Sequence, residues 1–481
     1  MIRCAAALAA LASVGVAAAL GCASGERAAD VGPREVYQQH CAACHGARRY
    51  GGYAPPLMPE TLERKDDAAL VQTILAGRPN TQMPAFGDRI GTEMAASLVG
   101  LFREPVRAIS WTLPDIAASR VEPEAEERPL PAGVRRENLT LVVERGRGAV
   151  SILDGDSLRE LGRFEAGAIH GGLKFDRDLR VVMAVTRDGT ALAYDLLRGR
   201  LRARVKVGVN ARNIALSPDG AFAAVANQLP AGLVLLDGAL RPLASIPVEG
   251  QPSGVYPLPG QARFALALRD VSRLVTVGYP DLDVRSVELP EPFEDLVFVP
   301  GSTRLVASSR DGHRLVLYDF ASGEVLASLA TQGLPHLFSA CFFEHAGVPY
   351  AAFNHVGIPK LSIVDMQAFA VREEIPLRGS GFFARTHEGT PYLWVDTNTE
   401  AIQLVDKRTL SLAPRALVPA VGKKAMHVEF TAEGDKAFVS VWHPEGAVVV
   451  YDSNSLAELA RIPYAMPVGK YNAANKTRLL Q

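Results

Sequence analysis

The sequence has few of the residues that stabilise small secreted scaffolds or attract polyanions. Its 481 residues include five cysteines and three tryptophans, and 51 Lys and Arg residues are balanced by 52 Asp and Glu residues. Two of the cysteines lie in the first 22 residues and two more are only three positions apart, which leaves Cys341 alone and argues against a disulfide framework. The formal net charge of -1 gives no electrostatic case for nucleic acid. Hydrophobic residues make up 48% of the chain, which indicates a globular protein with two domains or one repeat array.

The one long apolar run lies at the N-terminus. Met1-Ile2-Arg3 precede an apolar segment over residues 4–20, which has the charged start and small-residue core of a secretory signal. The segment is short for a membrane span. We therefore predict that residues 1–22 are a signal peptide and that the mature protein is periplasmic. The ending Ala19-Leu20-Gly21-Cys22 also resembles a lipoprotein cleavage box, in which case Cys22 would carry a lipid anchor.

The most specific motif is Cys41-Ala42-Ala43-Cys44-His45. Two thiols at this spacing can add to the two vinyl groups of one porphyrin, and the adjacent imidazole then lies over the iron. A zinc half-site would need a second ligand pair, and the sequence has no second pair of cysteines at this spacing. The motif therefore predicts one covalent haem c, bound through Cys41 and Cys44, with His45 as an axial ligand.

The second axial ligand is expected on a loop that returns across the haem. Met83 follows His45 by 38 positions, and Pro84 would stiffen its loop. Met58 is the competing candidate. A thioether ligand raises the reduction potential, which suits an acceptor of electrons. Apolar residues at helical spacing predict helices over residues 66–76 and 92–102. Residues 30–105 are therefore predicted to be a small all-α cytochrome c domain.

A polar, Pro-rich segment over residues 106–137 predicts an exposed linker. From residue 138 the pattern changes to apolar β-runs separated by turns such as Pro218-Asp219-Gly220, and several closing runs end in Asp. This repeat is typical of a β-propeller. Residues 139–481 number 343, which gives eight blades of about 43 residues; seven blades of about 49 residues stay open.

This domain order resembles the cytochrome cd1 family, in which a cytochrome c domain precedes an eight-bladed propeller that holds non-covalent haem d1. Local matches lie at residues 141–145, 151–156, 168–170, 386–387, 392–396 and 467–472. The resemblance implies an all-α cytochrome c domain followed by an all-β, d1-type propeller over residues 138–481.

The resemblance also implies how a d1-type tetrapyrrole is held. His170 stands at the position of the family's proximal iron ligand. Arg145, Arg187 and Arg212 stand where family arginines meet the carboxylates of the macrocycle, and a guanidinium can bind a carboxylate through two hydrogen bonds.

Nitrite reductases of this family add two distal histidines that protonate nitrite. The corresponding segments here, residues 266–270 and 292–296, contain no histidine, so acid catalysis of nitrite reduction is missing. The resemblance then implies the dehydrogenase branch of haem d1 biosynthesis, which oxidises a propionate side chain of dihydro-haem d1 to an acrylate and passes electrons to haem c. Nitrite reduction to nitric oxide, and non-catalytic haem d1 binding or delivery, stay as alternatives.

His336, His427 and Tyr471 stand where the catalytic residues of that branch would fall. We predict His427 and Tyr471 to be a proton-handling pair beside the propionate, and His336 to be a second base or a distal iron ligand. His345, His355 and His443 are reserves. The implied partners are the tetrapyrrole substrate, an electron acceptor and, transiently, cytochrome cd1 nitrite reductase. Phosphate-loop and flavin signatures are absent, so tetrapyrroles are the only redox cofactors predicted.

Overall fold

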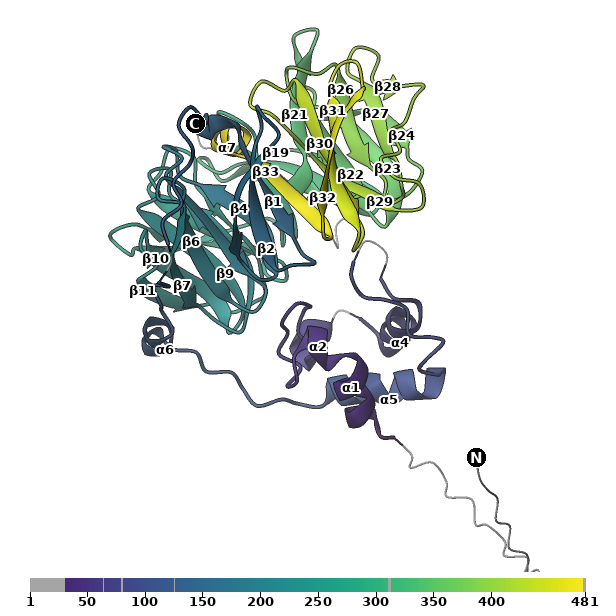
Figure 1. Ribbon diagram of the computed structural model, residues 1–481. Helices are drawn as coiled ribbons and strands as arrows, with labels where there is room; N and C mark the ends of the chain where they lie inside the picture. Colours follow the sequence, from purple (N-terminus) through teal and green to yellow (C-terminus); the bar gives the residue numbers. More distant parts are fainter. Residues whose placement is uncertain (1–30, 64, 79–80, 125, 310–312, 479–481) are drawn as a thin grey trace, which may run out of the picture.

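The computed structural model describes residues 31–63, 65–78, 81–124, 126–309 and 313–478. The chain forms a small helical domain and a large ring of β-sheets (Figure 1). The predicted signal peptide and Cys22 lie outside the described residues. Within those residues, no helix is both long enough and apolar enough to cross a membrane.

The helical domain packs its helices around one apolar cluster. The helices are α1 (Pro33–His40), α2 (Ala42–His45), α3 (Pro59–Leu62), α4 (Asp67–Ala76) and α5 (Thr92–Arg103). Asp66 caps α4 by accepting the Ala69 N–H at 2.7 Å. Ala95 and Leu98 on α5 are fully buried in the cluster. Both helices predicted for this domain are confirmed to within one residue.

The linker contains a helix that the sequence analysis missed. Helix α6 (Leu113–Ala118) begins at a capping box formed by Thr112 and Asp115. Ile116 is fully buried in a propeller core cluster, and the Trp111 indole donates to the Lys206 carbonyl at 2.8 Å. The prediction of an exposed linker is therefore wrong for this part, because its few apolar side chains find a buried site on the propeller.

In the part of the chain that the structure describes, the ring consists of eight antiparallel sheets, as predicted, and therefore of eight blades. The first blade is completed by the last strand of the chain, β33 (Pro467–Asn472), which pairs with β1 (Leu139–Glu144). This pairing ties the two ends of the propeller together, so that the ring has no open edge between its first and last blades.

The other strands of blades 1 to 4 are β2 (Ala149–Asp154), β3 (Glu160–Glu165), β4 (Ile169–Phe175), β5 (Val181–Thr186), β6 (Thr190–Asp195), β7 (Arg200–Lys206), β8 (Asn210–Leu216), β9 (Phe222–Leu229), β10 (Ala231–Asp237), β11 (Pro242–Pro247), β12 (Pro252–Pro257), β13 (Arg263–Leu268), β14 (Arg273–Gly278) and β15 (Val284–Glu288). Blades 5 to 8 contain β16 (Asp295–Phe298), β17 (Arg304–Ser309), β18 (Arg314–Asp319), β19 (Glu324–Ala330), β20 (Leu334–Pro335), β21 (Cys341–His345), β22 (Val348–Val356), β23 (Ile358–Asp365), β24 (Ala370–Pro376), β25 (Ala384–Arg385), β26 (Tyr392–Asp396), β27 (Ile402–Asp406), β28 (Ser411–Leu412), β29 (Lys424–Phe430), β30 (Lys436–Trp442), β31 (Gly446–Asp452) and β32 (Glu458–Tyr464). Short helices η1 (Arg136–Asn138), η2 (Leu337–Ser339) and α7 (Ala473–Thr477) complete the domain.

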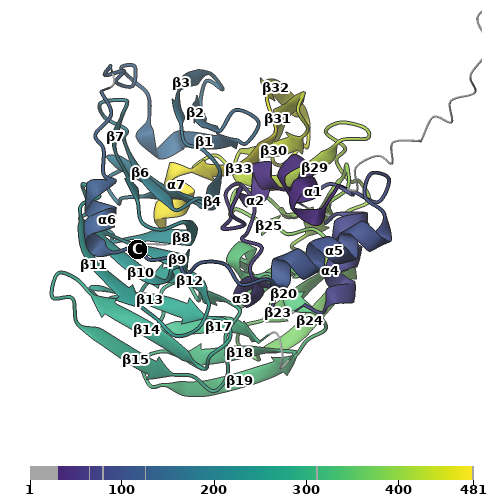
Figure 2. The same cartoon turned by 90° about the horizontal axis from the view of Figure 1, so that it is seen from below.

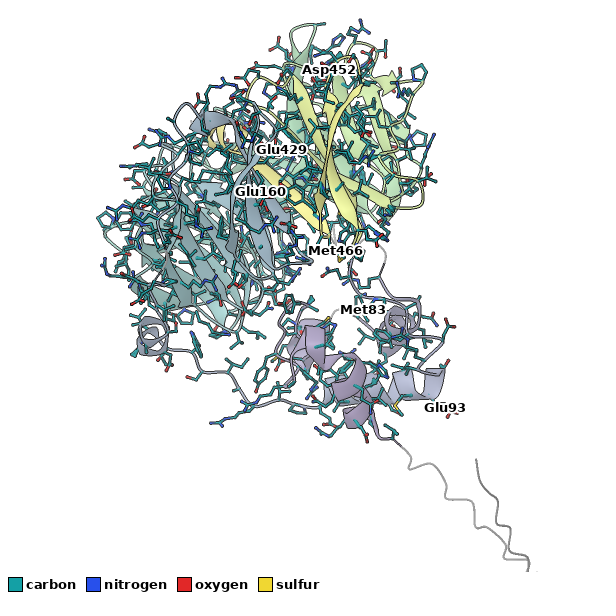
Figure 3. All side chains as sticks on the ribbon, in the orientation of Figure 1. Met83, Glu93, Glu160, Glu429, Asp452 and Met466 are labelled. Carbon is teal, nitrogen blue, oxygen red and sulfur yellow. The ribbon has the colours of Figure 1, made fainter. Side chains whose placement is uncertain are left out.

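The repeated Asp at strand ends has a local role in the turns. Asp452 ends β31, and its Oδ1 accepts the backbone N–H groups of Asn454 and Ser455. Asp365 ends β23 and accepts from Gln367 and Ala368 in the same way. These carboxylates satisfy turn donors that the sheet leaves unpaired. Figure 3 labels Asp452 at the end of the blade far from the helical domain.

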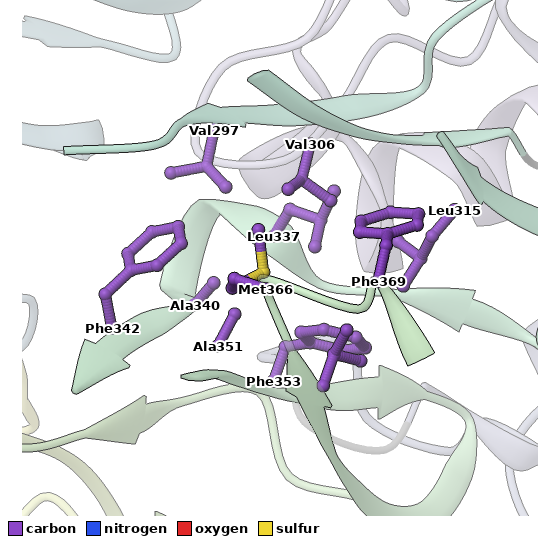
Figure 4. A pocket seen from close by; sticks show the side chains of 11 residues that line it. Val297, Val306, Leu315, Leu337, Ala340, Phe342, Ala351, Phe353, Met366 and Phe369 are labelled. Carbon is purple, nitrogen blue, oxygen red and sulfur yellow. The ribbon is translucent and has the colours of Figure 1, made fainter. Parts of the chain in front are cut away.

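Apolar side chains fill the space between blades. A small gap between blades 5 and 6 is lined only by apolar residues, among them Val306, Leu337 and Phe353 (Figure 4). It has no room for a water molecule. The gap belongs to the packed core and is not a ligand site.

The helical domain lies across one end of the propeller. Seen from that side, its helices stand in front of the ring of blades (Figure 2). Gln251 Nε2 donates to the Glu60 carbonyl at 2.7 Å, and Arg145 Nη1 donates to Gln82 Oε1 at 3.2 Å. Helix α7 lies towards the opposite end of the propeller (Figure 1). This arrangement brings the cytochrome motif next to the mouth of the ring.

Candidate functional site

The cytochrome motif forms the end of the first helical segment. Cys41 follows α1 and Cys44 lies on α2, and neither thiol forms a disulfide. His45 Nδ1 lies 2.7 Å from the Pro55 carbonyl oxygen, which can only accept, so Nδ1 carries the hydrogen and Nε2 keeps its lone pair. Two free thiols and an oriented imidazole nitrogen fit a covalent haem c.

Met83 lies in the same apolar cluster as Cys41 and Ala42, whereas Met58 is not a member of that cluster. The loop around Met83 is braced by the Arg78 N–H, which donates to the Met83 carbonyl at 3.1 Å. Figure 3 shows Met83 on the side of the helical domain that faces the propeller. The neighbouring residue, Gln82, accepts the hydrogen bond from Arg145. The predicted sixth ligand therefore lies on the loop that contacts the propeller mouth.

Arg145, Arg187 and Arg212 gather at this mouth. Burial and the neighbouring charges of Arg212 and Arg145 lower the pKa of Arg187. Arg78 of the helical domain acts in the same direction. Arg145 also spans the two domains, because its Nη2 donates to the Ile169 carbonyl at 3.2 Å. Among the described residues, the charges that shift Arg187 are all cations, so this mouth favours an anionic ligand.

His170 lies on β4 between these arginines. Its Nδ1 contacts the Arg212 carbonyl oxygen, so Nδ1 carries the hydrogen and Nε2 keeps its lone pair. Burial, followed by the charges of Arg187 and Arg212, keeps the pKa of His170 well below its usual range. A neutral imidazole with a lone pair on Nε2 is the form that ligates iron, and Arg212 Nη1 lies 3.2 Å from this nitrogen.

A row of rings connects the three residues predicted to be catalytic. The His336 ring lies 5.9 Å from Phe383, Phe383 lies 4.7 Å from His427, and His427 lies 5.5 Å from Tyr471, measured between ring centroids. These residues come from four different blades, because Tyr471 lies on the closing strand β33. The structure therefore brings His336, His427 and Tyr471 into one centre.

The two histidines of this row carry their hydrogens on different nitrogens. His336 Nδ1 lies 2.9 Å from the Phe382 carbonyl oxygen, so Nδ1 carries the hydrogen and Nε2 can accept a proton. His427 Nδ1 instead accepts the Lys470 backbone N–H at 3.3 Å, which leaves the hydrogen on Nε2. His336 is therefore built to accept a proton and His427 to donate a hydrogen bond.

Tyr471 lies close to the strand that carries His170. A Cβ added at Gly172 would lie 2.7 Å from the Tyr471 ring, so glycine permits this close approach. Burial raises the pKa of Tyr471 to about 12, which keeps the phenol protonated. The phenol is a hydrogen-bond donor at neutral pH.

A second group of cations lies around Tyr471. Lys476 Nζ lies 5.5 Å from the centroid of the Tyr471 ring and pairs with Glu429 at 3.2 Å. Burial, followed by the charges of Lys476 and Arg385, lowers the pKa of Lys174 to about 8. The centre thus has cations both at the mouth and beyond it, which suits a ligand with several carboxylates.

Comparisons with known proteins agree with this geometry. Residues 134–476 match the family model described as Cytochrome D1 heme domain, and residues 28–100 match Cytochrome C oxidase, cbb3-type, subunit III. The first match spans most of the chain. The chain belongs to the cytochrome d1 haem domain family. Its helical domain is a c-type cytochrome domain that holds a covalent haem c.

Relatives in this family carry out different functions. Dihydro-heme d1 dehydrogenase of Pseudomonas aeruginosa is 39% identical over 461 residues, which cover 92% of this chain and 93% of that protein. Nitrite reductase of Stutzerimonas stutzeri is 22% identical and covers 92% of both chains. A solved structure of dihydro-heme d1 dehydrogenase NirN in complex with DHE has a TM-score of 0.78 and 38% identity, and covers 92% of this chain and 100% of that one.

The sequence did not point to several residues that supply charge to this centre or position its rings. Lys174 follows His170 by four positions on β4, a spacing that could have been noticed. Arg385 adjoins a segment that already resembled the family. Phe382 and Phe383 carried no recognisable motif, and Asp396 lay in a segment that resembled the family without being assigned a role. Of the reserve histidines, His355 is satisfied at both nitrogens, by Gln332 and Ser362, and is structural.

Proposed function

We propose that this chain is a periplasmic dehydrogenase of haem d1 biosynthesis. Its substrate is dihydro-haem d1, and the reaction oxidises one propionate side chain to the acrylate of haem d1. The observation that carries the proposal is the row of His336, Phe383, His427 and Tyr471, which lies within one electrostatic environment with His170 and its arginines. This centre supplies a base, hydrogen-bond donors and carboxylate-binding cations in one place.

The substrate would be held by one imidazole and by cations. His170 Nε2 is the candidate ligand of the substrate iron, and Arg145, Arg187 and Arg212 are candidates for its carboxylates. Arg212 influences the pKa of both His170 and His336, so these two histidines share one electrostatic environment. The bound macrocycle would thereby present an edge to the catalytic row.

His336 is the candidate base. Conversion of a CH2–CH2 unit to CH=CH removes two protons and two electrons. Burial, followed by the charges of Arg212 and Arg385, lowers the pKa of His336 to about 4, so its Nε2 is unprotonated at neutral pH. His336 can therefore accept one proton from a propionate carbon, and the second proton leaves to solvent.

His427 and Tyr471 are candidates for holding the propionate carboxylate. His427 presents Nε2–H and Tyr471 presents its phenol, and both stay protonated at these atoms at neutral pH. Donors of this kind, aided by Lys174 and Arg385, stabilise the negative charge that develops when a neighbouring carbon loses a proton. Haem c, when bound, supplies a one-electron acceptor for each of the two electrons.

Nitrite reduction is the less favoured function. In the segments that should carry the two distal histidines of nitrite reductases, Arg269 Nη1 lies 3.6 Å from Glu294 Oε1. A partly buried ion pair at this position offers neither of the two imidazole acids that nitrite protonation needs.

The proposed role requires the product to leave. Haem d1 would pass to cytochrome cd1 nitrite reductase through a transient contact, and a separate acceptor would reoxidise haem c. Both partners would be met in the periplasm, where a lipid on Cys22 would confine the chain to the membrane surface.

The test uses the full-length protein with oxidised haem c and added dihydro-haem d1. We expect the macrocycle spectrum to shift to that of haem d1 while haem c becomes reduced, with two electrons released per substrate. His427→Ala should reduce turnover at least 100-fold with haem c retained. His443→Ala is the matched control and should turn over normally.

Two results would contradict the proposal. An unchanged macrocycle spectrum under oxidising conditions, with the tetrapyrrole bound, would leave a haem d1 carrier. Sustained nitric oxide production from nitrite and a reduced donor would assign nitrite reduction instead.

A further inference from the structure

One buried carboxylate connects both catalytic histidines. Asp396 ends β26, and only 1% of its surface is exposed. Its Oδ1 accepts the backbone N–H groups of Phe382 at 2.7 Å and Phe383 at 3.0 Å. Its Oδ2 accepts the backbone N–H of His427 at 3.1 Å. Both carboxylate oxygens therefore hold main chain that belongs to the catalytic row.

On one side the carboxylate acts through Phe382. The Phe382 carbonyl accepts from His336 Nδ1 at 2.9 Å, and this contact determines which nitrogen of His336 can take a proton. The Asp396 main chain reaches the same histidine by a second route. The Asn354 side-chain Nδ2 donates to the Asp396 backbone carbonyl at 3.3 Å. The Asn354 backbone carbonyl in turn accepts the backbone N–H of His336 at 2.9 Å.

On the other side the carboxylate stabilises an unfavourable backbone conformation. His427 has a φ of +49° and lies at the register shift between Met426 and Val428. A non-glycine residue in this region costs free energy, and it persists only where surrounding contacts hold it. The Asp396 Oδ2 contact is one of these, and the Lys470 ammonium, which donates to the His427 carbonyl, is another.

The close approach of the two segments is also built into the sequence. A Cβ added at Gly381 would lie 1.8 Å from the Asp396 carbonyl oxygen, so only glycine fits before Phe382 and Phe383. The Phe383 ring then lies between the two histidines, at 5.9 Å from His336 and 4.7 Å from His427.

We propose that Asp396 is a positioning residue that sets the separation and orientation of His336 and His427. It touches neither imidazole ring and acts through the backbone of Phe382, Phe383 and His427. The role deepens the proposed dehydrogenase function and rests on it. It predicts that the separation of base and hydrogen-bond donor depends on this carboxylate, and with it the contact that keeps the hydrogen of His336 on Nδ1.

Asp396→Asn in the full-length, haem c-containing protein tests the proposal. An amide has the same shape, but its NH2 group must face either the His427 N–H or the pair from Phe382 and Phe383. At least one backbone N–H would then face a donor in place of an acceptor. We expect kcat to fall about 10- to 100-fold, because small displacements of reacting groups have effects of this size. KM should change less than kcat, because Asp396 contacts none of the three arginines proposed to hold the substrate carboxylates and affects only the His427 contact.

Asp365→Asn is the matched control. Asp365 also ends a strand and accepts two backbone N–H groups, at 2.8 and 2.9 Å, but these belong to a blade-edge turn. The kcat of Asp365→Asn should stay at the wild-type value. Asn354→Ala is a milder second variant, since it removes one contact to Asp396 without adding a donor. Its kcat should fall about threefold to tenfold, again with KM retained.

A readout that does not depend on turnover separates this proposal from the proposed function. In protein labelled with nitrogen-15 histidine, wild-type His336 should show hydrogen on Nδ1 and His427 on Nε2. Asp396→Asn should blur or shift these two signals and leave that of His355 unchanged.

Wild-type kcat in Asp396→Asn with unchanged signals would overturn the proposal. Equal losses of kcat and of substrate affinity would overturn it as well, because they indicate a merely structural role. A wild-type protein without dehydrogenase activity would instead refute the proposed function, and the histidine signals would still test Asp396.

Discussion

Arg212 contacts both ring nitrogens of His170. Its main-chain oxygen accepts from Nδ1, and its guanidinium Nη1 lies 3.2 Å from Nε2. The first contact orients the imidazole, whereas the second covers the lone pair that an iron ion needs. His170 can therefore ligate a substrate iron only after the Arg212 guanidinium moves away from Nε2. The displaced guanidinium is then available to bind a carboxylate of the same substrate.

This relationship predicts the effect of removing the ligand. His170→Ala should weaken dihydro-haem d1 binding on the order of 10- to 100-fold, a loss of about 1.4 to 2.8 kcal/mol, and should change the spectrum of the bound macrocycle. Absorption titration measures both, and His345→Ala serves as the control. Unaltered affinity and spectrum in His170→Ala would remove His170 from the site.

The low pKa of His336 predicts the acid side of the pH profile. A base must be unprotonated, and burial lowers the pKa of His336 to about 4. The value of kcat/KM for dihydro-haem d1 should therefore be insensitive to His336 above about pH 5 and fall tenfold per unit below about pH 4. His336→Gln should lose most turnover and lack this limb. A midpoint near the usual histidine pKa would contradict the assignment of His336 as the base.

The axial ligand of haem c predicts a redox difference. Met83→Ala should lower the reduction potential of haem c on the order of 0.1 V, because axial ligands span roughly 0.8 V and a thioether raises the potential. Spectroelectrochemical titration measures it. Met58→Leu, at the competing methionine, should leave the potential unchanged; the reverse pattern would assign Met58 as the ligand.

Asp295 predicts a pH dependence of stability. It accepts the Phe338 N–H at 2.9 Å beside the catalytic row, and burial raises its pKa to about 7. A raised acid pKa contributes stability that is full below the unfolded value and is lost as pH rises through about 7. The melting temperature of the wild type should therefore fall from about pH 4 to about pH 8 more steeply than that of Asp295→Asn.

Asp319→Asn gives the contrasting control for this measurement. Backbone hydrogen bonding from Ala321 lowers the pKa of Asp319, so its stabilising effect is lost as pH falls and not as pH rises. Melting curves followed by circular dichroism from about pH 2 to about pH 8 distinguish the two, because the effect of Asp319 is lost below about pH 4. Parallel curves for the wild type and Asp295→Asn would show that folding does not raise the pKa of Asp295.

The sequence by itself determined the haem c attachment and the two-domain order. Cys41, Cys44 and His45 are contiguous, so covalent geometry alone brings their atoms to one porphyrin. The β-runs and Asp-ended turns predict a propeller because their contacts are local. The count of eight blades needed the structure, since the length of the repeat region also allowed seven. Helix α6 needed it as well, because Ile116 is buried only where the helix packs on distant strands.

Only the tertiary structure decided the arrangement of the catalytic centre. His336, His427 and Tyr471 were chosen through a family resemblance, and nothing local places them in one row. Asp396 lies in a segment that resembles the family, but the sequence does not show its role, because its hydrogen bonds go to main-chain N–H groups of residues in neighbouring segments. Which nitrogen of each histidine carries its hydrogen depends on the Phe382 carbonyl and the Lys470 N–H. Those contacts exist only after separate blades have closed into a ring.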